Sequence, residues 1–224
     1  MFSDPILKKL VKKYPKPAFQ DRSEFLFEDL IESIISQQLS VKASDTIFRR
    51  FKELFGNIRH SGEAQSADTR ILEEKSIDSG RARLAAKRAR MTEIYFPLPE
   101  QILTMPDQTI RTAGISFQKI SYIKTIAQAF TNNQINITEI KHMSDEEVII
   151  HLTKLKGVGK WTAEMTLIFT LNRPDVFSLG DLGLRRAIEN LYGITNHQEI
   201  LTLTENWKPH RSTASWYLWR SLEN

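Results

Sequence analysis

Apolar residues recur every three or four positions along most of the chain, and this spacing is typical of helices. Between residues 24 and 55 the pattern breaks once, at residues 37–40, where Ser40 is well placed to cap a second helix. Long runs of alternating apolar and polar residues, which would indicate strands, are absent. We therefore predict an all-α fold, with further short helices over about 99–104, 107–113 and 116–131.

The last third of the chain carries clearer helix signals. Ser144 and Glu147 match a capping box, S-x-x-E, which predicts a helix from about 145 to 154. Two glycines follow, and a second helix continues from there to a stop before Pro174, because a proline disfavours helical geometry in the residue before it. The final helices are expected over 181–192 and 212–222.

Composition narrows the class of protein. The chain has 224 residues, 41% of them hydrophobic and 26% charged, as in ordinary globular proteins. The absence of cysteine excludes disulfides, zinc-thiolate sites, iron–sulfur clusters and a cysteine nucleophile. No apolar run approaches the roughly 20 residues that span a bilayer, and the basic N-terminus does not resemble a signal peptide. We expect an intracellular protein whose net charge of +4 permits a nucleic-acid partner without requiring one.

The segment Leu155-Lys-Gly-Val-Gly-Lys-Trp-Thr-Ala163 lies between two predicted helices. Two glycines one residue apart permit a tight turn and the close approach of another backbone. The next helix begins at this turn, so its unpaired amides form an anion site. We interpret the segment as a helix–hairpin–helix that grips DNA phosphates, the alternative being an ordinary helix connection. The expected DNA-backbone contacts are Lys156, Gly157, Gly159, Lys160 and Thr162.

Asp181 follows Gly159 by 22 residues and precedes a predicted helix. An aspartate at a helix start is favoured in its ionised form by the macrodipole and by amide hydrogen bonds. Taken alone, it could be a plain N-cap.

Together with three further segments, the hairpin and Asp181 carry a resemblance. The segments are Phe27–Lys42 with Gln37-Gln38-Leu39, Gly114–Lys119, and Trp207–Arg211 continuing to Trp219. The chain resembles the helix–hairpin–helix DNA glycosylase superfamily, in particular its DNA-3-methyladenine glycosylase II branch, over about 24–58 and 96–222. Three features depart from that pattern: an insertion over about 59–95, Gly180 where many relatives carry a second acid, and His210 where the bacterial alkylation-repair enzyme has an aromatic residue.

The resemblance implies two helical subdomains with a DNA-binding cleft between them, into which the target nucleotide is flipped. The N-terminal subdomain would comprise residues 24–135, including the insertion. The helix–hairpin–helix subdomain would comprise 1–23 together with 136–224.

The resemblance also assigns roles to individual residues. Asp181 matches the family's catalytic aspartate, which stabilises an oxocarbenium-like state and can orient or deprotonate water. Trp161 occupies the position of the lysine that forms a Schiff base in strand-cutting members, so no lyase activity is expected. Trp161 and Trp219 match positions near the base pocket, where rings attract a cationic base. Gln38 is the candidate plug for the gap that the flipped base leaves, and Leu39 its neighbouring wedge.

Other aromatic and basic residues allow two interpretations. Trp207 and Trp216 lie at helical spacing and are expected to be core residues. Lys42 and Arg211 could contact phosphate, but surface basic residues are common. The five histidines show no metal-ligand spacing, so we expect no metal and no cofactor, apart from an accessory monovalent cation that hairpin carbonyls hold in some relatives.

The expected function is a monofunctional DNA glycosylase of base excision repair that removes alkylated purines, chiefly 3-methyladenine, from double-stranded DNA and leaves an abasic site. An alkylated purine is already cationic and needs no partner acid, which suits a lone Asp181. The alternatives are a non-catalytic helix–hairpin–helix DNA-binding module and a glycosylase for another lesion. We expect a monomer, located in the cytoplasm or nucleoid of a bacterium or in the nucleus of a eukaryote.

The 59–95 insertion has few large apolar residues and ends in a basic run with no acid. It is interpreted either as a solvated helix or loop or as an added DNA contact through Arg81, Arg83, Lys87, Arg88 and Arg90.

Overall fold

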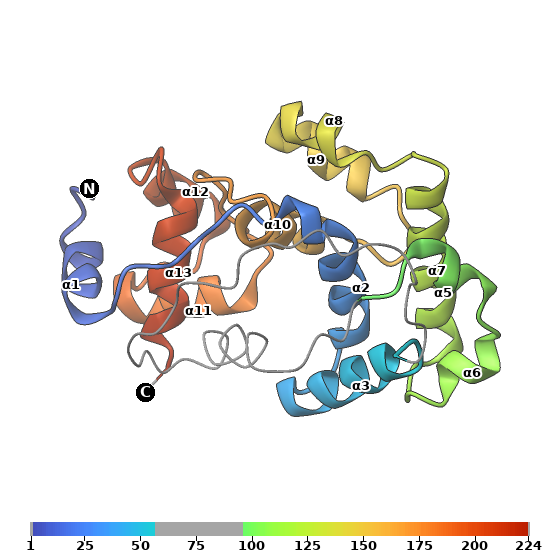
Figure 1. Cartoon of the computed structure of the whole chain (residues 1–224). Coiled ribbons are helices and arrows are strands. Elements are labelled where there is room, and N and C mark those ends of the chain that lie inside the picture. Colours follow the sequence, from blue (N-terminus) through green and yellow to red (C-terminus); the bar gives the residue numbers. More distant parts are fainter. Residues whose placement is uncertain (1, 57–95, 224) are drawn as a thin grey trace, which may run out of the picture.

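The computed structural model describes residues 2–56 and 96–223, so the predicted roles of the 59–95 insertion lie outside the described residues. The described residues form helices and no strand, which confirms the predicted all-α class (Figure 1). Up to residue 131 the chain holds α1 (Pro5–Lys13), the 3₁₀ helix η1 (Ser23–Phe25), α2 (Leu26–Ser36), α3 (Val41–Glu53), α5 (Pro99–Thr104), α6 (Asp107–Arg111) and α7 (Phe117–Thr131). The rest of the chain holds α8 (Ile137–His142), α9 (Asp145–Leu152), α10 (Lys160–Phe169), α11 (Leu182–Tyr192), α12 (His197–Glu205) and α13 (Arg211–Ser221).

Side-chain caps set two of the helix starts that the sequence predicted most clearly. The Ser40 hydroxyl accepts a hydrogen bond from the Ala43 amide at the start of α3, at 3.4 Å. Ser144 and Glu147 form the predicted capping box of α9, with bonds of 3.2 and 2.7 Å. Both helix predictions are confirmed. They were possible because the cap and the amide that it binds are three residues apart, so their hydrogen bond forms without help from the rest of the fold.

Sequence patterning missed α1, α8 and α12. Each begins at an Asp or Asn whose side chain accepts hydrogen bonds from two backbone amides, at Asp4, Asn136 and Asn196. These caps were the available signal. The helices themselves are short, with six to nine residues, and present few apolar positions to a pattern search.

The larger hydrophobic core centres on α2, whose Leu26, Leu30, Ile31 and Ile34 are fully buried. Helix α2 packs against α3, α7 and α10. The same core includes buried residues of α8, α9 and α10, so the hairpin between α9 and α10 is anchored to α2 and α7.

A second core joins the two ends of the chain. Helix α1 lies beside α13 and shares this core with α11 and α12 (Figure 1). Asp4 ties the ends together: its carboxylate accepts from the Tyr192 hydroxyl at 3.0 Å and from the Trp207 indole at 3.4 Å. Burial and the Asp4 charge raise the pKa of Tyr192. Trp207 is buried in this core, as predicted.

The predicted subdomain boundary at residue 135 stays a prediction. The larger core takes its buried residues from the described part of the chain between Leu26 and Val176, so this core extends beyond residue 135. Trp219 packs against both cores, so the end of α13 lies at their junction.

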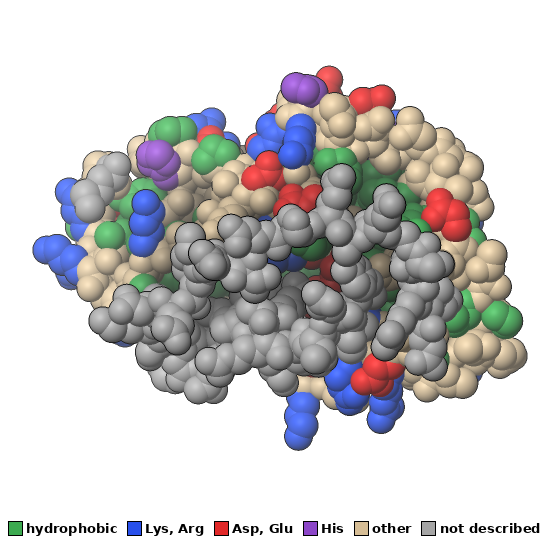
Figure 2. All heavy atoms as spheres, in the orientation of Figure 1, with side chains coloured by type: hydrophobic (Ala, Val, Ile, Leu, Met, Phe, Trp, Pro, Cys, Tyr) green, Lys and Arg blue, Asp and Glu red, His purple; other side chains and the backbone are tan. Residues whose placement is uncertain are grey.

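The surface of the described residues is mixed in charge. Lysine and arginine side chains lie at the edge of the molecule over α1 and at the edge over α3 (Figure 2). Within residues 2–56 and 96–223, none of the helices combines the length and apolar character needed to cross a membrane.

Candidate active site

The hairpin between α9 and α10 is shaped by Gly157. Its φ of +89° lies in the left-handed region, and a Cβ there would stand 2.5 Å from Cδ2 of Tyr122 and 3.0 Å from Cδ1 of Ile34. Only glycine fits without displacing the core behind the hairpin. Gly159 differs, because no atom lies within 4 Å of the position its Cβ would take.

Helix α10 begins directly after Gly159. The first backbone bond within this helix runs from the Ala163 amide to the Gly159 carbonyl, at 3.0 Å. The amides of Lys160, Trp161 and Thr162 therefore have no acceptor in the helix, as at any helix start. A helix N-terminus with such amides and its positive dipole end suits an anion such as phosphate.

Asp181 is the N-cap of α11. Its Oδ1 accepts a hydrogen bond from the Leu184 amide at 2.8 Å and another from the Trp219 indole Nε1 at 2.9 Å. Its Oδ2 accepts from the Trp161 indole Nε1 at 2.8 Å. The structure thus brings together the three residues that sequence reasoning placed in the catalytic and base-binding site, although they lie on three different helix ends.

Three donors hold the Asp181 carboxylate in one orientation. Each carboxylate oxygen can accept about two hydrogen bonds, so Oδ1 is fully used and Oδ2 keeps one free acceptor direction. The negative charge lies at the N-terminus of α11, where the helix dipole favours it. An oriented carboxylate with one open lone pair can face a cationic centre or hold a water molecule.

The two tryptophans differ in exposure. Trp219 packs against the Phe169 ring, with centroids 5.6 Å apart, and belongs to the core junction. Trp161 is 43% exposed, so one part of its ring is open to a ligand while the indole N–H binds Asp181. Both rings therefore have a role that the sequence did not reveal: they position the carboxylate.

The turn that follows α2 places the candidate plug beside the hairpin. Gln38 has a φ of +59° and an exposed side chain, and Leu39 is also exposed. The preceding Gln37 donates from Nε2 to the Gly157 carbonyl at 2.9 Å, which links this turn to the hairpin. That bond uses one of the two acceptor directions of this hairpin carbonyl, and a monovalent cation at the hairpin stays a prediction.

Lys119 supports the same turn from α7. Its ammonium donates to the carbonyls of Ile35 and Gln37 at 2.9 and 2.8 Å. Burial lowers the pKa of Lys119. A cation at the C-terminal end of α2 satisfies carbonyls that the helix leaves unpaired and interacts well with the dipole.

The remaining predicted DNA-backbone residues fall into two groups. Lys156 and Lys160 are exposed at the hairpin, where both can approach a phosphate, and the Lys160 ammonium also lies 3.8 Å from Oε1 of Glu164. Thr162 differs: the whole residue is only 4% exposed, because it is the third residue of α10 and faces the core, and its contact to the DNA backbone stays a prediction.

Arg211 is engaged inside the protein. Its guanidinium donates to both carboxylate oxygens of Asp175, at 2.9 and 3.0 Å, and to the Asp175 carbonyl at 3.0 Å. Burial raises the pKa of Asp175, but the hydrogen bonds and charge of Arg211 outweigh it and hold that pKa below its usual value. The alternative in which Arg211 contacts phosphate is therefore not supported by its position.

The positions that depart from the family pattern lie at the surface. Gly180 is exposed and has open space where a side chain would begin, so the position next to Asp181 could sterically accept an acid. His210 is exposed and meets Phe2 edge to face, with centroids 6.3 Å apart.

Sequence reasoning missed Glu164 and Ser178. Glu164 is only 6% exposed, and its carboxyl accepts a hydrogen bond of 2.5 Å from the buried Ser178 hydroxyl. A glutamate four residues after Lys160 looks like one half of a surface ion pair, so the pattern held no signal of burial.

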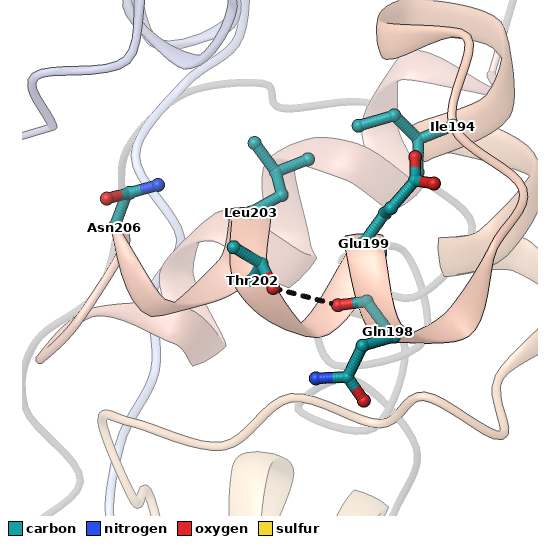
Figure 3. A pocket seen from close by; sticks show the side chains of 6 residues that line it. All are labelled: Ile194, Gln198, Glu199, Thr202, Leu203 and Asn206. Carbon is teal, nitrogen blue, oxygen red and sulfur yellow. Dashed lines mark hydrogen bonds between the residues drawn. The ribbon is translucent and has the colours of Figure 1, made fainter.

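A separate shallow groove of about 370 Å³ runs along α12 and includes Ile194, Gln198 and Leu203 (Figure 3). None of its lining residues belongs to the hairpin or to the Asp181 cluster. Among the described residues, no group of histidine, aspartate and glutamate side chains is arranged to hold a metal ion.

Comparison with known proteins shows which proteins the chain is similar to. Residues 31–211 match the model of the HhH-GPD superfamily base excision DNA repair proteins. A relative from Schizosaccharomyces pombe, named DNA-3-methyladenine glycosylase 1, is 34% identical over 219 residues, covering 96% of this chain and 80% of the relative.

Two solved structures are also similar. The S. pombe 3-methyladenine DNA glycosylase Mag1 in complex with abasic DNA matches with a TM-score of 0.72 and 31% identity, covering 99% of this chain and 93% of that one. A DNA-3-methyladenine glycosidase from Bacillus halodurans matches with a TM-score of 0.69 and 27% identity, covering 99% and 91%. The chain belongs to the HhH-GPD superfamily of base excision DNA repair proteins.

Proposed function

We propose that this protein is a monofunctional DNA glycosylase that hydrolyses the N-glycosidic bond of alkylated purines in double-stranded DNA and leaves an abasic site. The observation that carries the proposal is the Asp181 carboxylate, held by two indole N–H groups and one backbone amide. The names of the similar proteins, which refer to 3-methyladenine and to abasic DNA, support the choice of substrate and product.

The chemistry follows from charge. Departure of the base leaves positive charge on the sugar, and a fixed carboxylate stabilises that charge more in the transition state than in the ground state. The open acceptor direction of Asp181 Oδ2 suits either the sugar cation or the attacking water. The alkylated purine leaves as a neutral base, so the reaction needs no acid on the leaving group, and we propose that it needs no cofactor.

Residues other than the catalytic Asp181 are the proposed contacts that hold the DNA. The amides at the start of α10, with Lys156 and Lys160, are the proposed contacts to the phosphate backbone. Gln38 and Leu39 project from the turn after α2 and are the proposed occupants of the gap left by the flipped nucleotide. The exposed part of Trp161 is the proposed contact for the cationic base. We further propose that the protein acts as a monomer in the nucleoid of a bacterium or the nucleus of a eukaryote.

The test is release of 3-methyladenine from methylated duplex DNA, followed by chromatography. The wild-type protein should release the base, and Asp181→Asn should reduce the single-turnover rate by about 100-fold or more. Asparagine cannot accept on both sides, so its amide nitrogen would face one indole N–H. Asp181→Ser is therefore the companion variant, because serine retains an N-cap acceptor for the Leu184 amide.

The outcomes separate the candidate functions. Loss of base release in both variants, with DNA affinity retained, supports the proposal. Base release that persists without the carboxylate contradicts the role of Asp181. A wild-type protein that binds DNA but releases no base would instead favour another lesion or a DNA-binding module.

A further inference from the structure

A buried carboxyl lies behind the candidate active site. Glu164 is on the inward face of α10, one turn after Trp161, and is 6% exposed. Its Oε2 accepts the Ser178 hydroxyl hydrogen at 2.5 Å, and Ser178 is itself fully buried. A buried carboxyl costs free energy unless its oxygens are hydrogen-bonded. The hydrogen bond from Ser178 reduces this cost for Glu164 and makes the two side chains a specific pair.

Ser178 begins the turn that presents Asp181. The Ser178 carbonyl accepts the Asp181 amide hydrogen at 3.1 Å, closing a tight turn immediately before α11. Ser178 therefore links α10 to this turn: its hydroxyl donates to Glu164 on α10, and its carbonyl accepts from the amide of Asp181. The bond between Trp161 and Asp181 makes a second tie between the same two elements.

The charge on the hairpin completes the arrangement. The Lys160 ammonium lies 3.8 Å from Oε1 of Glu164 and is otherwise well exposed. The carboxyl therefore faces a cation on its outer side and a hydroxyl on its inner side. Lys160 is the first residue of α10, where a phosphate is expected, and Ser178 begins the turn that ends at Asp181, so Glu164 contacts both regions.

We propose that Glu164 and Ser178 are positioning residues that fix the Asp181 turn against the hairpin helix. They set the distance between the phosphate-binding end of α10 and the reacting carboxylate, and they touch neither substrate nor base. The kinetic consequence rests on the proposed glycosylase function, whereas the structural link can be measured without it.

The first measurement reads the link directly. The four tryptophans give four indole N–H signals in a proton–nitrogen NMR spectrum, assigned by replacing each ring in turn. Ser178→Ala and Glu164→Leu should both shift or broaden the Trp161 signal, because Asp181 moves relative to that donor. The Trp216 signal should stay in place. Glu164→Gln should leave the Trp161 signal near its wild-type position, since its amide oxygen can still accept the Ser178 hydroxyl.

The second measurement is the single-turnover rate of base release alongside DNA affinity. Ser178→Ala and Glu164→Leu should slow release by about 10- to 100-fold, the cost of a displaced catalytic group. DNA affinity should be unchanged in Ser178→Ala, whereas Glu164→Leu also removes the negative charge beside Lys160 and should bind DNA at least as tightly as the wild type. Glu164→Gln should retain most of the rate. The double variant Glu164→Leu with Ser178→Ala should be no slower than either single variant, because both remove the same bond.

Thr204→Val provides a matched control for general loss of a buried hydroxyl. Thr204 is buried in α12, within the second core, and its hydroxyl bonds only to the Leu201 carbonyl among the described contacts. This variant should change neither the Trp161 signal nor the rate, even where its melting temperature falls as far as that of Ser178→Ala.

Each outcome has one meaning. An unmoved Trp161 signal, or a moved signal with an unchanged rate, overturns the positioning role while leaving the proposed function intact. A wild-type protein without base release refutes the proposed function, and the NMR arm then decides the structural link alone. A variant that unfolds is replaced by Ser178→Cys, which keeps a weaker donor and should give intermediate values of both readouts.

Discussion

Substitution of Gly157 and Gly159 by alanine should separate two glycines that look equivalent in the sequence. At Gly157 the added Cβ would meet the Tyr122 ring at 2.5 and 2.8 Å and Ile34 at 3.0 Å. The clashing Tyr122 atoms include Cγ, at the base of the ring, and Ile34 is fully buried, so neither neighbour can turn aside cheaply. At Gly159 the added Cβ would meet nothing within 4 Å.

The magnitude follows from two costs and one gain. A non-glycine residue in the left-handed region costs about 1–2 kcal/mol, and overpacking a well-filled core costs about 1–3 kcal/mol. Restriction of the unfolded chain by alanine returns about 0.4–1 kcal/mol. We expect Gly157→Ala to lower the free energy of unfolding by about 3 kcal/mol, which for a chain of this size is a fall in melting temperature of about 6–12 °C.

Gly159→Ala should behave differently, because its φ of −90° is accessible to alanine. Its free energy of unfolding should stay within about 1 kcal/mol of the wild type. The methyl group would nevertheless stand in the open space in front of the α10 amides, so binding to duplex DNA should weaken. Thermal unfolding with fluorescence-detected DNA binding measures both effects in the same samples.

Equal melting temperatures for the two variants would refute the reasoning, because they would mean that Tyr122 and Ile34 yield to the added methyl without cost. A stable Gly157→Ala protein that had lost only DNA binding would show that this glycine serves the ligand rather than the core.

Two further predictions concern contacts that hold the fold. Arg211→Met should destabilise the protein by about 2 kcal/mol at pH 7. Because the folded pKa of Asp175 is depressed, the stability that the Arg211–Asp175 contact contributes is present above the unfolded pKa of Asp175 and is lost as pH falls through the folded pKa. Urea unfolding should therefore show a smaller loss of stability in the variant near pH 3 than at pH 7, and equal losses at the two pH values would contradict this prediction. Asp4→Ala should cost about 2–3 kcal/mol in thermal unfolding because it removes the cap of α1 and the Tyr192 contact, whereas Asn196→Ala, which removes a cap alone, should cost about 1 kcal/mol.

The helices near the site could be predicted because their signals are local. The starts at Ser40 and Ser144 depend on a side chain and an amide three residues away, and the apolar spacing of α2 reports a face that any helical core would bury. Asp181 could also be identified, since an aspartate before an apolar helix is an N-cap in almost any fold. The family resemblance then supplied its chemical role.

The contacts that make a site of these residues join positions far apart in the chain. Trp161 and Trp219 lie 20 and 38 residues from Asp181, and both indole bonds depend on how α10 and α13 pack beside α11. The same holds for Gln37, whose amide reaches a carbonyl 120 residues away. Hydrogen bonds of this kind leave no periodic pattern, because their geometry is set by helix packing rather than by spacing.

The sequence by itself determined the helices with clear apolar spacing or a serine cap, the hairpin and the N-cap position of Asp181, because each depends on a few neighbouring residues. Only the tertiary structure distinguished Gly157, packed against Tyr122, from the open Gly159. It also buried Thr162 and Glu164, which an isolated helix would present without preference. Burial is decided by what packs on each face of a helix, and that information lies in the other helices rather than in the segment itself.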